Sequence, residues 1–185
     1  MRPAEREIYE QIWDRPEYRR IAPGELMAKL FLNWTKPEKG STVIDFGCGT
    51  GRGARILAQY GLSVTGVDFA QNCLDKGVAE SGFKFLEKDL TKPIGLEAEY
   101  GFCTDVMEHI PPEDVLKVLR NVRACVEKAF FNISTLPDNW GSRLVGHELH
   151  LTIEQPPWWR EQLKRAGFEV LHEYPTEGCA IFYAA

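Results

Sequence analysis

The chain lacks the features that mark secreted proteins, membrane-spanning proteins or small proteins stabilised by a bound metal. Its 185 residues include only five cysteines, which are scattered and never form a Cys-x-x-Cys pair. Neither a disulfide framework nor a zinc knuckle is therefore expected. Apolar runs extend over only a few residues, far short of the roughly 20 that span a bilayer, and the N-terminal residues lack a signal segment. We expect a cytoplasmic protein with no membrane partner.

Positive charge is also scarce, since 22 Lys and Arg residues face 27 Asp and Glu residues and the net charge is −5. Such a balance gives no general attraction to nucleic acid, and no nucleic-acid partner is expected. Arg15, Arg19 and Arg20 form the one notable basic cluster. We interpret this cluster as the solvated end of a helix.

The order of the elements predicts an α/β fold. From Thr42 onward, short β-branched runs alternate with segments of helical periodicity, a pattern typical of a mainly parallel sheet. Residues 1–40 read as a helical leader or lid, broken near Pro16 and Pro23, and residues 41–185 as the core. The length suits one domain, 1–185. The predicted strands lie at 42–46, 63–67, 83–86, 100–104, 129–134, 169–173 and 180–184, and the helices of the core at 52–60, 72–80, 112–126 and 158–166.

A glycine-rich turn after the first predicted strand carries the clearest functional signal. Asp45 closes the strand, and Gly47, Gly49 and Gly51 follow before a helix begins. This segment resembles the first motif of class I S-adenosylmethionine-dependent methyltransferases. The glycines alone also satisfy the G-x-G-x-x-A form of the dinucleotide fingerprint. A carboxylate at Asp45 would repel a pyrophosphate but would attract an ammonium and a sulfonium, so it favours the methyl donor.

Acids at two later strand ends agree with this resemblance. Asp68 ends the second strand, and the matching acid of the family accepts both ribose hydroxyls, which needs a bidentate acceptor on a rigid strand end. Phe69 could lie against the adenine or could simply pack. Asp89 and Leu90 match the pair that receives the adenine, through a carboxylate and a backbone N–H. An Asp that caps a turn is the alternative interpretation of Asp89.

The fourth strand leads into Thr104-Asp105-Val106-Met107-Glu108-His109, which resembles the family's D-V-L-E-H motif. The resemblance implies that the backbone of Thr104 and Asp105 passes the methionine part of the cofactor. If the turn continues as a helix, Asp105, Glu108 and His109 share one face. His109 could then take a proton from the acceptor, with Glu108 orienting its imidazole.

A divalent metal at Asp105, Glu108 and His109 is an alternative that we do not favour, although the same pattern resembles the metal-binding element of certain O-methyltransferases. His147 or His150 would complete such a site, and His150 is also a candidate for the proton acceptor. The long polar segment 135–152 that carries both is expected to border the active site.

The family resemblance covers residues 42–184 and implies a Rossmann-like fold. The expected sheet has seven mostly parallel strands, with helices on both faces and an antiparallel C-terminal hairpin. We expect S-adenosylmethionine as cofactor and a small-molecule O or N acceptor, because the Asn/Asp-Pro-Pro-Tyr/Phe motif of DNA amino-methyltransferases is absent. A nicotinamide-dependent oxidoreductase and a cofactor-binding protein without turnover are the rival hypotheses. Aromatic residues that could wall the acceptor pocket, or pack, are Trp13, Tyr18, Trp140, Trp158 and Trp159.

Overall fold

A single seven-stranded sheet organises the protein in a computed structural model that describes residues 3–80 and 83–185. The strand order is β3-β2-β1-β4-β5-β7-β6. The five strands from β3 to β5 pair in parallel, and β7 runs antiparallel to both β5 and β6. The predicted fold class is therefore confirmed. The strands are β1 (Thr42–Phe46), β2 (Ser63–Asp68), β3 (Lys84–Glu87), β4 (Ala98–Thr104), β5 (Val126–Ser134), β6 (Val170–Thr176) and β7 (Cys179–Ala184).

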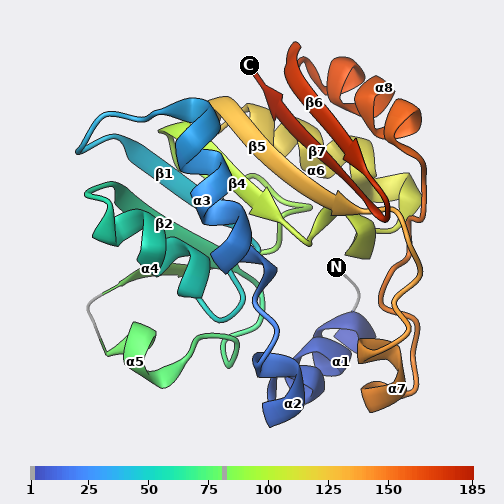
Figure 1. Ribbon diagram of the computed structural model, residues 1–185. Helices are drawn as coiled ribbons and strands as arrows, with labels where there is room; N and C mark the ends of the chain where they lie inside the picture. The colour runs from blue at the N-terminus through green and yellow to red at the C-terminus, as the bar shows by residue number, and fades with distance from the viewer. Residues whose placement is uncertain (1–2, 81–82) are drawn as a thin grey trace.

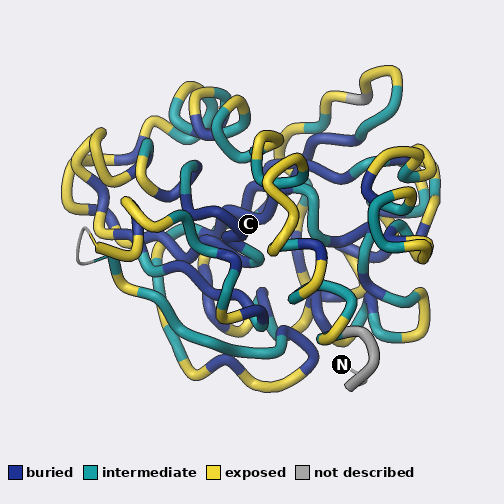
Figure 2. The backbone as a smooth tube through the Cα atoms, turned by 90° about the horizontal axis from the view of Figure 1, so that it is seen from below, coloured by how far each residue is buried: buried dark blue, intermediate teal, exposed yellow. Residues whose placement is uncertain are grey.

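Helices cover both faces of this sheet (Figure 1). One face packs against α3 (Pro23–Thr35) and α4 (Arg52–Gln59), and the other against α6 (Pro112–Arg123) and α8 (Pro156–Ala166). Apolar side chains at helical spacing explain this arrangement, because each helix buries one stripe against the strands. Figure 2 shows that the buried backbone runs through the middle of the molecule and that most outer turns are exposed.

Three further helices gather below the carboxyl ends of the parallel strands (Figure 1). They are α1 (Pro3–Trp13), α2 (Pro16–Arg19) and α7 (Gly141–Val145). The leader thus forms three helices where the sequence predicted two pieces, because Pro16 and Pro23 each occupy the first turn of a new helix, where a missing N–H costs nothing. We refer to α1 and α2 as the lid.

Three helical predictions differ from the structure. The helix expected at 112–126 ends at Arg123, and Val126 already begins β5. The helix expected at 72–80 shrinks to α5 (Lys76–Ala79), since the carbonyl groups of Asn72 and Cys73 accept hydrogen bonds from an arginine of the lid. The turn after β4 does not continue as an α-helix. Asp105 adopts a left-handed φ of 59°, and only a short 3-10 helix, η1 (Met107–His109), follows.

The C-terminal hairpin forms as expected, with a tighter connection than the predicted 174–179. Thr176 pairs with Cys179, so Glu177 and Gly178 alone make the turn. All five cysteines are free, and four of them are buried. Within the described residues, no helix is long and apolar enough to cross a membrane.

Helices α3 and α4 approach each other through two glycines at the edge of the sheet nearest the lid. A Cβ on Gly53 would lie 3.0 Å from the backbone carbonyl carbon and oxygen of Gly24. The contact joins backbone to backbone, so it cannot be relieved by turning a side chain. A larger residue at Gly53 must therefore separate the two helices.

We expect Gly53→Ala to lower the free energy of unfolding by about 1–3 kcal/mol, the usual cost of overpacking. The matched control is Gly77→Ala in α5, where a Cβ meets nothing within 4 Å. That variant should be neutral or more stable by about 0.5–1 kcal/mol, since alanine restricts the unfolded chain. Urea unfolding of both variants measures the difference, and equal midpoints would contradict the close approach.

Candidate active site

A cavity of about 460 Å³ opens where β1, β2 and β4 end. Open α/β sheets bind ligands at this edge, because the strand order reverses there and leaves a crevice. The glycine turn, the strand ends, the lid and the segment 135–152 all contribute to the wall. The cavity brings together every residue that the sequence assigned to the site except Gly51 and Glu108, which lie behind its wall. His147 is exposed and does not line the cavity either.

The glycine turn needs its glycines for two reasons. Gly47, Gly49 and Gly51 have φ values of 70°, 48° and 73°, in the left-handed region that side chains disfavour. A Cβ on Gly47 would also lie 2.4 Å from the Val106 side chain, and one on Gly49 would lie 2.9 Å from the Trp13 indole. The lid therefore packs directly on the turn, a contact that the sequence did not reveal.

Asp68 links the glycine turn to the end of β2. Its Oδ2 accepts the N–H of Gly49 at 3.0 Å, and its Oδ1 accepts the N–H of Ala70 at 3.0 Å. Burial raises the pKa of Asp68 even though these N–H groups lower it. Each carboxylate oxygen keeps a second lone pair, so the side chain can still accept two hydroxyl groups.

Asp45 is almost completely buried at the end of β1. Burial, together with the neighbouring Asp68, raises the pKa of Asp45 to about 8. In the protein without a bound cation, Asp45 is therefore protonated at neutral pH, whereas the sequence analysis assumed a carboxylate. A cation placed beside it would favour the ionised form.

The cavity wall is acidic. Among the described residues that line it there is no lysine and no arginine, while five aspartates contribute. An anionic diphosphate would meet no lysine or arginine among these described lining residues, but a cation would meet several carboxyl groups. The five are Asp45, Asp68, Asp89, Asp105 and Asp138.

Asp89 and Phe69 complete the wall around Asp68. The Oδ1 atom of Asp89 accepts the N–H of Thr91 at 2.8 Å, which is the turn-capping bond considered as an alternative for this residue. Asp89 lies on the wall of the cavity beside Leu90. Phe69 meets Tyr9 of the lid edge to face, with ring centroids 5.2 Å apart. Phe69 thus both lines the cavity and supports the lid.

Two histidines lie together on the wall of the cavity. The rings of His109 and His150 are perpendicular, with centroids 4.8 Å apart. Each Nδ1 contacts a backbone carbonyl, that of Leu149 at 3.0 Å for His109 and that of Leu136 at 2.6 Å for His150. A carbonyl selects the tautomer that is protonated on Nδ1, which leaves Nε2 as a proton acceptor.

Burial and the nearby His150 lower the pKa of His109 to about 4, so this imidazole is neutral at pH 7.

Glu108 makes long-range contacts that the sequence did not predict. Its Oε1 accepts the N–H of Ser134 at 2.8 Å, and its backbone carbonyl accepts the N–H groups of Leu151 and Thr152. Glu108 therefore fastens β5 and the end of segment 135–152 to η1, while the Leu149 carbonyl contacts Nδ1 of His109. Because Asp105 has a left-handed φ, it also does not share a helical face with Glu108 and His109.

The geometry changes the set of groups that could hold a metal. A carboxylate oxygen of Glu108 and ring nitrogens of His109 and His150 lie within 4.8 Å of one another. Asp105, which the sequence pattern included, is outside this group. Burial and Asp105 raise the pKa of Glu108 well above its usual value.

The aromatic residues divide between cavity and core. Trp13, Tyr18 and Trp140 line the cavity, and Tyr18 stacks on Trp140 with centroids 5.9 Å apart. Trp159 is completely buried under the sheet, and Trp158 packs against it. Sequence reasoning missed the wall residues Tyr9 and Asp138. Asp138 accepts the N–H groups of residues 140–142 at the start of α7, a helix-capping pattern that its spacing could have indicated.

Comparison with known proteins agrees with this geometry. The model of a family described as a methyltransferase domain matches residues 18–173. A ubiquinone biosynthesis O-methyltransferase from Stutzerimonas stutzeri is 28% identical over 154 residues, which are 76% of this chain and 66% of that protein. The 23S rRNA uracil methyltransferase RlmD from Pseudomonas fluorescens is 30% identical over 175 residues, 87% of this chain and 35% of that protein.

The chain therefore spans slightly less than two thirds of the first of these curated relatives and about a third of the second. Among solved structures, a magnesium protoporphyrin IX methyltransferase from Synechocystis PCC 6803 with bound SAH is similar with a TM-score of 0.70. It is 18% identical, and the match covers 98% of this chain and 94% of that one. The chain belongs to the methyltransferase domain family, among the class I S-adenosylmethionine-dependent methyltransferases.

Proposed function

We propose that the cavity binds S-adenosylmethionine and that the chain transfers its methyl group to a small-molecule O or N acceptor. The observation that carries this proposal is the charge of the wall, five aspartates with no lysine or arginine among the described lining residues. The ligand would bring an ammonium and a sulfonium and no phosphate, so it fits an acidic cavity. A dinucleotide would bring two negative charges to the same place, which argues against a nicotinamide-dependent oxidoreductase.

In this proposal, the cofactor is held by residues of the strand ends and of the glycine turn. Asp68 accepts the two ribose hydroxyls through the lone pairs left by Gly49 and Ala70. Asp89 and Leu90 receive the adenine, with Phe69 against its face. The methionine part lies along the glycine turn, near the lining residues Asp45, Gly47, Gly49, Thr104 and Asp105. Gly51 acts behind the wall, where it lets the turn keep its shape.

The acceptor side lies between the lid and the segment 135–152. A bound cofactor would supply an electrophilic methyl group, and the acceptor's lone pair would attack it in line. His109 or His150 would take the acceptor's proton at Nε2, since each ring holds its Nδ1 against a carbonyl. In this assignment residues 1–40 form the helical leader that includes the lid, residues 41–185 the cofactor-binding core, and residues 1–185 one methyltransferase domain.

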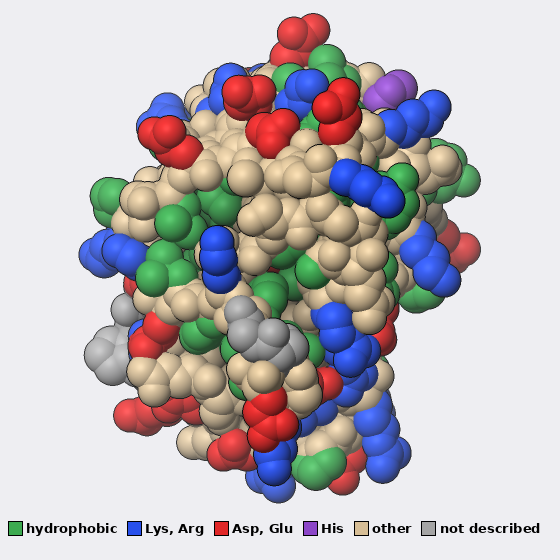
Figure 3. Space-filling model, turned by 90° about the vertical axis from the view of Figure 1, so that its left-hand side faces the viewer, with side chains coloured by type: hydrophobic (Ala, Val, Ile, Leu, Met, Phe, Trp, Pro, Cys, Tyr) green, Lys and Arg blue, Asp and Glu red, His purple; other side chains and the backbone are tan. Residues whose placement is uncertain are grey.

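Several observations support a small acceptor. The cavity is walled by aromatic side chains, and the net charge of −5 offers no general attraction to a polyanion. Acidic and basic side chains are both spread over the face shown in Figure 3. The RNA-modifying relative is matched over only 35% of its length, so its substrate does not carry over to this chain.

The ribose assignment predicts that Asp68→Ala weakens the binding of adenosylhomocysteine by about 1–3 kcal/mol, because two hydrogen bonds to a carboxylate are lost. Calorimetry measures this change. Glu99→Gln is the control, since Glu99 also accepts a backbone N–H, from Thr42, but at the other end of β1. NADH titrated into the wild type should produce no binding heat. Unchanged affinity in Asp68→Ala would refute the ribose assignment, and NADH binding would refute the proposed cofactor.

The raised pKa of Asp45 predicts a pH-dependent affinity for the cofactor. The ligand's cation favours the ionised carboxylate, whereas the cation-free protein holds the protonated form below pH about 8. Binding must then release a proton, so affinity should rise from pH 5.5 to 7.5, by at most about tenfold per pH unit. In Asp45→Asn this proton release should vanish, which calorimetry in buffers of different ionisation enthalpy detects. A slope that survives in the variant would assign the proton to another group.

The acceptor assignment predicts methyl transfer that depends on the two histidines. We expect a screen of phenols, amines and carboxylic acids with radiolabelled cofactor to identify an acceptor. If one of the two histidines is the base, its replacement by asparagine (His109→Asn or His150→Asn) should reduce the turnover of that acceptor by about 100-fold or more. The affinity for adenosylhomocysteine should stay unchanged in both variants. Transfer to no acceptor class would favour a cofactor-binding protein without turnover.

A further inference from the structure

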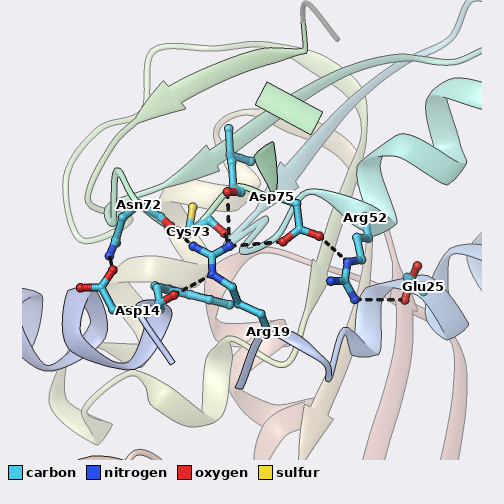
Figure 4. Close-up of polar contacts among 9 residues, drawn as sticks. Asp14, Arg19, Glu25, Arg52, Asn72, Cys73 and Asp75 are labelled. Carbon is cyan, nitrogen blue, oxygen red and sulfur yellow. Dashed lines mark hydrogen bonds and ion pairs between the residues drawn. The ribbon is translucent and has the colours of Figure 1, made fainter. Parts of the chain in front are cut away.

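Arg19 differs from the other two arginines of its sequence cluster. Arg15 and Arg20 are exposed, as a solvated helix end requires, but the Arg19 side chain is only 25% exposed. Its guanidinium reaches out of the lid into the loop that follows β2, residues 70–75, which we call the hinge loop (Figure 4). The expectation of a solvated cluster is therefore wrong for Arg19.

The guanidinium of Arg19 satisfies the backbone of the hinge loop. It donates to the carbonyls of Cys73 at 2.9 Å and Leu74 at 3.3 Å, to the carbonyl of Asn72, and to the Asp75 carboxylate at 3.2 Å. These carbonyls make no helix, because α5 begins only at Lys76. The Nε atom meanwhile donates to the carbonyl of Trp13 at 2.7 Å. One side chain thus fixes the end of α1 against the loop.

The hinge loop does not line the cavity itself, but it is joined to the glycine turn that does. It begins just after Asp68, and its Asp75 N–H donates to the carbonyl of Thr50 in the glycine turn at 3.1 Å. Arg52 of α4 binds the second oxygen of Asp75 at 2.6 Å and approaches Glu25 of α3 (Figure 4). Any change in the position of the loop is therefore transmitted to the turn that would hold the cofactor.

The lid reaches the acceptor side as well. Trp13 covers Gly49, and Tyr18 stacks on Trp140 at an interplanar angle of 9°. Asn72 adds a second attachment between the hinge loop and the lid, because its Nδ2 donates to the Glu10 carbonyl at 2.8 Å and to the Asp14 carboxylate at 2.9 Å. The lid is thus fastened to the hinge loop by Arg19 and Asn72 and forms a wall of the acceptor side.

We propose that Arg19 is a positioning residue that holds the lid closed over the bound cofactor and so completes the acceptor pocket. The inference rests on the proposed function, since it assumes that the ligand lies between the lid and the glycine turn. The lid held in this position would present Trp13 and Tyr18 to the acceptor. Arginine suits this role because its planar fork serves several carbonyls at once, which a lysine ammonium on a single stem does not.

The test uses Arg19→Ala and Arg19→Lys, with Arg20→Ala as the matched control because Arg20 is adjacent and exposed. The dissociation rate of adenosylhomocysteine, measured by stopped flow, should rise about tenfold or more in both Arg19 variants, which corresponds to about 1.4 kcal/mol. Hydrogen exchange of residues 3–20 should slow on ligand addition in the wild type and in Arg20→Ala but not in the Arg19 variants. A loss of fold stability alone would not produce this ligand-dependent difference.

Asn72→Ala provides a second test that leaves Arg19 and all its backbone acceptors in place. It should also speed dissociation, because it removes the other attachment of the lid. If the wild type fails to bind adenosylhomocysteine, the proposed function itself is wrong. If the wild type binds it but the Arg19 and Asn72 variants match Arg20→Ala in dissociation rate and lid exchange, the positioning role is overturned while the proposed function stands.

Discussion

The hydrogen bond from the Gly49 N–H to the Asp68 carboxylate is the contact on which the candidate site depends. It joins the turn after β1 to the end of β2 and fixes both where the sheet meets the cavity. The turn can take this position only because its glycines accept left-handed backbone. Val106 from one side and Trp13 from the other then occupy the space that side chains would need. The ends of β1 and β2, the lid and the motif after β4 all meet at this junction.

Buried carboxyl groups impose a cost on the folded protein. Asp45, Asp68 and Glu108 are each less than 7% exposed, and burial raises the pKa of all three. A fold selected only for stability gains little from such groups, because removing charge from water is unfavourable unless a partner compensates. No lysine or arginine supplies that partner among the described lining residues. A cationic ligand would, and for this reason the acidic wall carries the functional proposal.

Glu108 supports the structure of the site, whereas the two histidines are the candidates for its chemistry. Glu108 binds Ser134, Leu151 and Thr152 through their backbone N–H groups, and so it sets the path of the segment that carries His150. The carbonyls of Leu149 and Leu136 then leave one nitrogen of each imidazole available as a proton acceptor. The acceptor side is therefore assembled from loops held by buried polar contacts, whereas the cofactor side rests on strand ends.

The sequence by itself determined the sheet, its C-terminal hairpin and the acids at the strand ends, because these follow from local periodicity and from the fixed place of a residue on a strand. It could not determine the roles of Glu108 and Arg19, whose partners lie 26 and more than 50 residues away in the chain. Nor could it show that Asp45 rests protonated, since that depends on burial next to Asp68. Tertiary structure decided these features, because long-range hydrogen bonds and desolvation exist only once distant segments are packed together.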